Sequence, residues 1–161
     1  MPNARSLKAN HTPGLQYLLL LTCLLLPFNT PATTLSGQVI AVPDANRIIL
    51  LTADERRLPI ALLGLDVAGQ RAGKWRKIAK RHLHMLLAGR FVSVDFTTRD
   101  KQGVILGVVR HGGADIGLRL LHSGLAVINQ NQALPSTLME SYRQAEQEAR
   151  RRGMGFWQAV R

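Results

Sequence analysis

The side chains that most often carry chemistry in proteins are few in this chain and widely separated. The only cysteine, Cys23, lies in an apolar run near the N-terminus. His82 and His84 are two positions apart in a segment with helical periodicity, so they point to different faces and do not make a metal-binding pair. His111 lies beside two glycines in a turn, and His122 lies near a helix end. The histidines therefore predict no metal or acid–base site of their own.

A stripe of cations is the clearer chemical feature. Lys74, Lys77 and Arg81 recur at spacings of three and four residues, which places them on one side of a helix. Such a stripe can follow a phosphate backbone without reading the base sequence. The same stripe is also typical of an ordinary solvated helix face, and charge alone does not separate the two interpretations.

Basic residues outnumber acidic residues in the 161-residue chain. Lysine and arginine number 21 against 10 aspartates and glutamates, which gives a formal net charge of +11. All ten acidic residues and 19 of the basic ones lie in residues 33–161, so this part alone carries +9. The balance favours an anionic partner, either nucleic acid, an anionic membrane surface or another polyanion, although basic charge can also serve solubility alone.

Residues 1–32 have the features of a targeting segment. Arg5 and Lys8 precede a leucine-rich run over residues 15–28, and small residues follow up to a possible cleavage position after Ala32. The run is shorter than the roughly 20 apolar residues of a transmembrane helix and fits the apolar part of a signal peptide. We therefore predict an exported protein, periplasmic or secreted, with an uncleaved membrane anchor as the alternative.

Cleavage at this position would leave residues 33–161 as the mature chain. That chain would lack Cys23, and hence any disulfide, thiol nucleophile or thiolate zinc site. It would also have no stable membrane span.

Residues 33–161 are predicted to form one domain, with residues 33–36 as a short linker. Apolar, β-branched runs separated by turn residues indicate an antiparallel meander of three strands, and a change to helical spacing follows. The expected elements are strands at 37–42, 47–51 and 58–63, a helix within 70–88, strands from 91 and at 104–109, a short helix from about 115 to 121, an extended piece at 125–128 and a last helix from 136 or 137.

Two of the helices have detailed expectations. The first should bury a stripe made of Trp75, Ile78, Ala79, His82, Met85 and Leu86. The last should begin with a capping box in which Thr137 and Glu140 satisfy the first free amides.

Five segments, in this order, resemble the staphylococcal nuclease (thermonuclease) family. Residues 58–69 are similar to the family's Arg-x-x-Gly-Ile-Asp-x-Pro-Glu pattern and keep its glycine and aspartate as Gly64 and Asp66. The other segments are 39–49, 100–107, 115–126 and 145–157. The resemblance implies the family's fold, an α+β structure in which three helices pack around a five-stranded β-barrel of the OB type.

The resemblance also implies where an active site would lie. Members of the family cleave phosphodiesters with a calcium ion, a glutamate that activates water and two arginines on the phosphate. On this chain Asp66 keeps one metal carboxylate, and the other metal position reads Asn46. The base position reads Gly69, and the two arginine positions read Ala61 and Val104.

These replacements predict an impaired enzyme. Loss of a general base costs about 10²–10⁴ in rate, and loss of one preorganised electrostatic donor costs about 10²–10³. Arg47 also places a cation beside the metal position. A one-residue shift would make Asp44 a ligand but would restore neither the base nor the arginines. We expect no cofactor, with Ca²⁺ as the alternative if Asp66 and Asn46 still bind a metal.

The sequence as a whole predicts an exported thermonuclease-like domain that binds nucleic acid or another polyanion non-specifically through Lys74, Lys77 and Arg81. One alternative is an active calcium-dependent nuclease with an altered site. A second is an envelope protein-interaction module in which the barrel is only a scaffold.

Overall fold

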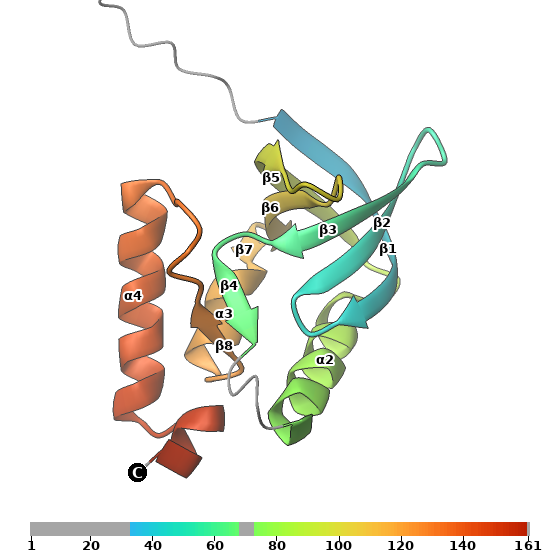
Figure 1. The fold of residues 1–161 in the computed structure, drawn as a ribbon. Helices are drawn as coiled ribbons and strands as arrows, with labels where there is room; N and C mark the ends of the chain where they lie inside the picture. The colour runs from blue at the N-terminus through green and yellow to red at the C-terminus, as the bar shows by residue number, and fades with distance from the viewer. Residues whose placement is uncertain (1–32, 68–72, 161) are drawn as a thin grey trace, which may run out of the picture. The chain divides into compact units, whose positions relative to one another are not determined.

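The computed structural model describes residues 33–67 and 73–160, and they form a closed five-stranded barrel with helices packed around it (Figure 1). This confirms the predicted α+β barrel of the OB type. The barrel strands are β1 (Thr33–Asp44), β2 (Arg47–Thr52), β3 (Arg57–Leu62), β5 (Phe91–Arg99) and β6 (Ile105–His111).

The barrel closes through one parallel pairing. The strands follow the order β3-β2-β1-β5-β6, with antiparallel neighbours throughout, and β3 then pairs in parallel with β6. In that seam Ile60 lies opposite Ile105, and both side chains are fully buried. Alternate residues of the strands point inward, so the apolar runs seen in the sequence become the core of the barrel.

The predicted linker at residues 33–36 is wrong. These residues begin β1 and pair with β5, with Thr33 opposite Phe96 and Ser36 opposite Ser93. Their polar composition resembles that of a linker, but β5 extends beyond the β1–β2 hairpin and supplies hydrogen-bond partners for their backbone. Pairing with a strand that is about 60 positions away cannot be seen in a short window of sequence.

The remaining elements surround the barrel. In Figure 1, α2 lies beside β1, whereas α3 and α4 pack against each other on the side of a small two-stranded sheet of β4 and β8. None of the helices in residues 33–67 and 73–160 is both long enough and apolar enough to cross a membrane. The bounds are β4 (Leu65–Val67), α2 (Gly73–Leu87), β7 (Ala114–Asp115), α3 (Ile116–His122), β8 (Ala126–Ile128), α4 (Ser136–Arg151) and the 3₁₀ helix η2 (Gly155–Val160).

The buried line of α2 differs from the predicted stripe. Ala79, Leu83 and Leu87 are buried, at four-residue spacing, whereas Ile78 and Met85 are exposed. Apolar residues occupy two neighbouring lines of this helix, and periodicity alone cannot choose between them. The contacts with β1 and β4 select the line in which small Ala79 permits close approach.

The two later helices begin differently from each other. Asp115 caps α3, as predicted, by accepting a hydrogen bond from the Leu118 amide at 3.2 Å. The capping box predicted for α4 is wrong, because its N-cap is Pro135 and no side chain caps the helix. Thr137 already lies inside the first turn, and the Pro135 carbonyl accepts the Met139 amide at 2.9 Å.

Two glycines let the end of α3 cross the turn that follows α4. Gly124 and Gly155 have φ angles of +63° and +52°. A Cβ atom on Gly124 would lie 2.1 Å from the Met154 carbonyl oxygen, and one on Gly155 would lie 2.4 Å from the Ser123 carbonyl oxygen. The Phe156 amide donates to the Gly124 carbonyl at 2.9 Å. Only residues without a side chain fit this backbone contact.

Candidate functional site

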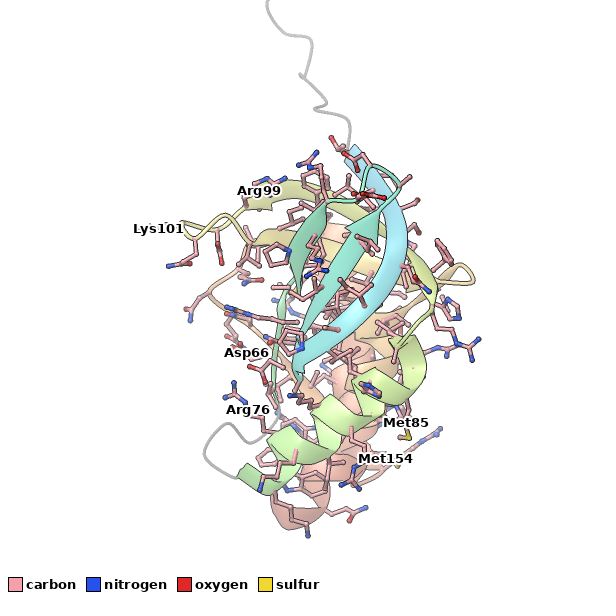
Figure 2. All side chains as sticks on the ribbon, turned by 90° about the vertical axis from the view of Figure 1, so that its right-hand side faces the viewer. Asp66, Arg76, Met85, Arg99, Lys101 and Met154 are labelled. Carbon is pink, nitrogen blue, oxygen red and sulfur yellow. The ribbon has the colours of Figure 1, made fainter. Side chains whose placement is uncertain are left out.

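A polar pocket of about 360 Å³ lies where the β1–β2 turn meets β4 and α2. In Figure 2, Asp66 and Arg76 lie on the same side of the domain, below the hairpin that carries Arg99 and Lys101. The lining residues are mostly charged or polar; they are Asp44, Asn46, Arg47, Asp66, Val67 and Arg76.

The carboxylate of Asp44 is already paired with a cation. Arg76 Nε donates to Asp44 Oδ1 at 3.0 Å, its Nη2 atom contacts Oδ2, and the Ala45 amide donates to Oδ1 at 2.7 Å. Partial burial acts to raise the pKa of Asp44, but these hydrogen bonds and the charges of Arg76 and Arg47 outweigh it and hold the pKa below its ordinary value. Asp44 is therefore ionised and neutralised by α2.

Asn46 holds the β1–β2 turn against β4. Its side-chain Nδ2 donates to the Leu65 carbonyl at 3.3 Å, and its backbone carbonyl accepts a hydrogen bond from the Leu62 amide at 2.9 Å. The side-chain NH₂ group thus holds the fold together, and the side-chain Oδ1 is the atom that can face a ligand.

Asp66 is positioned by the short strand β4. Its neighbours Leu65 and Val67 are buried, so the alternation of the strand directs the half-buried Asp66 side chain to the pocket side. The backbone of Asp66 pairs with that of Val127 in β8, which fixes this position to the second half of the chain. The structure thus brings Asp66 and Asn46 together in one pocket, with Asp44, Arg47 and Arg76.

Ala61 and Val104, which stand where the family has its two arginines, do not line the pocket. Ala61 and Val104 are both buried, at 7% exposure each, and offer no polar side-chain atom. Ala61 lies directly opposite Arg47 in the β2–β3 pairing. Cross-strand partners project from the same face of a sheet, so Arg47 places a guanidinium in the space beside Ala61. Gly69, at the base position, lies outside the described residues.

The three predicted phosphate-binding cations lie on α2. Lys74, Lys77 and Arg81 are all exposed, and Lys74 Nζ is 5.9 Å from the centre of the half-buried Trp75 ring. Arg76 comes from the same helix but points to the pocket and Asp44. Sequence reasoning placed Arg76 only among the basic residues of this helix, since nothing in the local sequence indicates its partner 32 positions earlier.

Among the described residues, the pocket offers few of the ligands that calcium takes. Calcium takes 6–8 oxygen ligands, mostly carboxylates and carbonyls. Here Asp66 and Asn46 Oδ1 are the available side-chain oxygens, Asp44 is paired with Arg76, and Arg47 adds a second positive charge. Across residues 33–67 and 73–160, three or more histidine, cysteine, aspartate or glutamate side chains nowhere gather as a metal site would require.

A second polar cluster is fully enclosed and belongs to the fold. Tyr142 donates from its hydroxyl to the Asp115 carboxylate at 3.3 Å, and the two residues are 1% and 7% exposed. Burial raises the pKa of Asp115, although the amides of Leu118 and Gly117 oppose the shift. Burial also raises the pKa of the Tyr142 hydroxyl, and the charge of Asp115 adds to that shift.

Comparison with known families agrees with this architecture. The family model described as staphylococcal nuclease homologue matches residues 59–159, which run from β3 to η2 and include Asp66 and α2. Among curated proteins, none matches the sequence. A domain of this kind indicates a nuclease-related or nucleic-acid-binding function. By this match over more than half its length, the chain belongs to the staphylococcal nuclease homologue family.

Proposed function

We propose that this protein is an exported thermonuclease-like domain that has lost efficient phosphodiester cleavage and binds nucleic acid or another polyanion without reading its sequence. Residues 1–32 act as the signal peptide in this proposal, and residues 33–161 form the mature domain. The observation that carries it is the pocket itself, in which two guanidinium groups face two carboxylates and one of those carboxylates is already neutralised.

The loss of cleavage follows from the chemistry of the pocket. A metal-assisted hydrolase needs a cation-binding set of oxygens and a base for the attacking water. Arg76 competes with any cation for Asp44, and the base position carries Gly69, which has no side chain. Ala61 and Val104 cannot stabilise charge on a phosphate.

Binding needs fewer groups than cleavage, and those groups are present. No hydrogen bond or ion pair joins the Arg47 side chain to a residue that the structure describes. Its charge helps to lower the pKa of Asp44, and its guanidinium can still donate to a phosphate oxygen. On α2, the exposed cations Lys74, Lys77 and Arg81 form a separate stripe, about 100–160° around the helix from Arg76. We infer that a phosphate backbone lies along α2 and ends at Arg47.

The first part of the test is cleavage of single-stranded DNA by the full chain, with calcium or with a chelator. We expect no calcium-dependent cutting above background. Cutting that requires calcium and disappears in Asp66→Asn would overturn the proposed loss of activity and support the alternative of an active nuclease with an altered site.

The second part is binding of the same DNA at several salt concentrations. For single strands the logarithm of the affinity falls with the logarithm of salt with a slope of about −0.7 for each phosphate contact. Reversing two charges in Lys77→Glu/Arg81→Glu should weaken binding and reduce the slope by about 1.4. The double variant Arg119→Glu/Arg143→Glu, with the same change of charge at exposed positions of α3 and α4, is the matched control.

Equal weakening by both double variants would mean that net charge, rather than α2, determines binding. Failure of the folded chain to bind DNA or polyphosphate at low salt would overturn the proposal. It would favour the remaining alternative, an envelope protein-interaction module.

A further inference from the structure

We propose that the outer wall of the barrel carries a stacking site for a base of single-stranded nucleic acid, centred on Phe91. The proposal rests on the proposed function, because it adds a base contact to the phosphate contacts described above. Phe91 is 72% exposed and is the most exposed of the large apolar side chains that the structure describes. A single exposed apolar side chain needs no explanation, so the inference depends on the apolar groove beside the ring.

Phe91 begins a row of side chains that crosses four strands. In the pairing registers Phe91 of β5 lies opposite Gln38 of β1, Gln38 lies opposite Leu51 of β2, and Leu51 lies opposite Arg57 of β3. Direct cross-strand partners project from the same face of the sheet. One outer row therefore carries an aromatic ring, an amide, an aliphatic side chain and a guanidinium.

The space between Phe91 and Leu51 is a groove with a bare floor. It has a volume of about 310 Å³, and its lining is largely apolar. Gly37 lies in the floor, and a Cβ atom there would be 2.3 Å from the Leu51 carbonyl oxygen, so no larger residue fits without movement. Gln38 Nε2 donates to the Gly89 carbonyl at 3.0 Å, which holds this side chain against the wall. The lining residues are Ser36, Gly37, Gln38, Leu51, Thr52, Ala53 and Phe91.

The chemistry of this groove fits a nucleobase. A base is flat and apolar on both faces, so it can stack on the Phe91 ring and cover the glycine floor. Exposed Arg57 ends the same row on β3, and exposed Arg90 precedes Phe91 in the chain. Cations on both sides of an apolar groove complement a base that is flanked by phosphates.

A second copy of the chain is the alternative occupant of this groove, and the experiment below distinguishes it from a base. The groove is also separate from the polar pocket. It lies at the open end of the β1–β2 hairpin, and six residues of β1, roughly 20 Å, lead from Gln38 to Asp44 at the turn.

The experiment compares two polyanions that differ in whether they carry bases. The full chain is titrated with (dT)₁₅ and with inorganic polyphosphate of similar charge at one salt concentration. Phe91→Ala should weaken binding of (dT)₁₅ by about 5- to 100-fold, because each stacked base contributes that much, and should leave polyphosphate binding unchanged. Phe91→Leu, which keeps an apolar side chain but not the ring, should behave like Phe91→Ala, and Phe91→Trp should retain binding.

Met154→Ala is the matched control. Met154 is 41% exposed in the turn after α4, where Figure 2 labels it, and truncation of its side chain should affect neither titration. Wild-type affinity of Phe91→Ala for (dT)₁₅ would overturn the stacking site while leaving the proposed function intact. An equal loss of polyphosphate binding, or a wild-type dimer in sedimentation that Phe91→Ala abolishes, would overturn it as well. If the wild-type chain binds neither polyanion, the proposed function and the stacking site both fail.

Discussion

Asp44 and Arg76 form an ion pair between a hairpin turn and a helix that are far apart in the sequence, and this pair decides the charge of the pocket. An arginine that is paired with a carboxylate makes that carboxylate a poorer metal ligand. A metal ion from solution must then compete with the arginine for the carboxylate oxygens. Arg47 adds a second cation to the pocket from β2, opposite Ala61, without an ion pair to a described carboxylate. The charge of the pocket thus depends on two arginines, Arg76 of α2 and Arg47 of β2, at positions that are not part of the family's catalytic pattern.

The buried Tyr142 hydroxyl predicts how the free energy of unfolding changes with pH. Its pKa in the folded state is raised above the unfolded value of about 10, so the folded protein keeps the proton while the unfolded chain loses it. The resulting stability is complete below pH 10 and is lost as the pH rises further, with a slope of up to about 1.4 kcal/mol per pH unit. Urea unfolding followed between about pH 9 and 11 should show this slope in the wild type.

Tyr142→Phe is the control for that slope. It removes the titrating group, so its stability should fall less steeply over the same pH range, although Asp115 loses one donor and the variant starts about 1–3 kcal/mol less stable. Identical slopes in the two proteins would show that Tyr142 does not titrate differently on folding.

At the scale of elements, the strands were predictable from the sequence because each has its own alternation and its own turn residues. The start of β1 and the buried line of α2 were not, since both depend on a partner: β5 for Thr33, and β1 with β4 for Ala79. The start of α4 at Pro135 shows the same limit, because a capping box and a proline start are both compatible with the local sequence.

The site was predictable to a similar extent. The family pattern located Asp66 and Asn46, and the structure brings them together. It could not indicate Arg76, because a side chain on a helix reaches the pocket only through the packing of α2 beside β1. The phosphate-binding role of Lys74, Lys77 and Arg81 stays a prediction.

The crossing of α3 with the turn after α4 gives a prediction about stability. Gly124→Ala must both hold an alanine at a φ of +63° and displace the Met154 carbonyl oxygen, so we expect a loss of more than about 3 kcal/mol. Gly89→Ala is a matched control, because Gly89 has a φ of +72° but no neighbour within 4 Å of the added Cβ. It should cost only about 1–2 kcal/mol for the backbone conformation.

Chemical denaturation measures both variants. Equal losses for Gly124→Ala and Gly89→Ala would show that the two backbones separate easily and that the crossing contributes little to the fold.

At the scale of the whole molecule, the excess of positive charge is larger than the acidic residues can neutralise. The ion pairs within residues 33–67 and 73–160 use Asp44, Asp54, Asp95 and Glu148, and Glu148 is shared by two arginines. The formal net charge of +11 therefore leaves many cations that repel one another in the folded state.

This repulsion predicts a salt-dependent stability. Raising potassium chloride from about 10 to 200 mM shortens the Debye length from about 30 Å to below 10 Å, so the melting temperature of the full chain should rise by a few degrees. Thermal unfolding followed by circular dichroism measures the effect. A melting temperature that falls over this range would mean that the attractive ion pairs outweigh the repulsion.

The seam between β3 and β6 has a consequence for how fast this chain can fold. Ile60 and Ile105 pair although they are 45 positions apart in the sequence, whereas short turns connect the strands of the β1–β2 and β2–β3 pairs. Local hairpins form in microseconds, but a long loop must lose entropy before its distant contacts become favourable. The β1–β2–β3 meander before α2 and the β5–β6 hairpin after it can therefore form early. The pairing of β3 with β6, which joins these two parts, should set the folding rate. Until that moment both seam strands expose unpaired backbone that can bind another unfolded chain, and afterwards residues 60–62 and 105–107 are paired with each other.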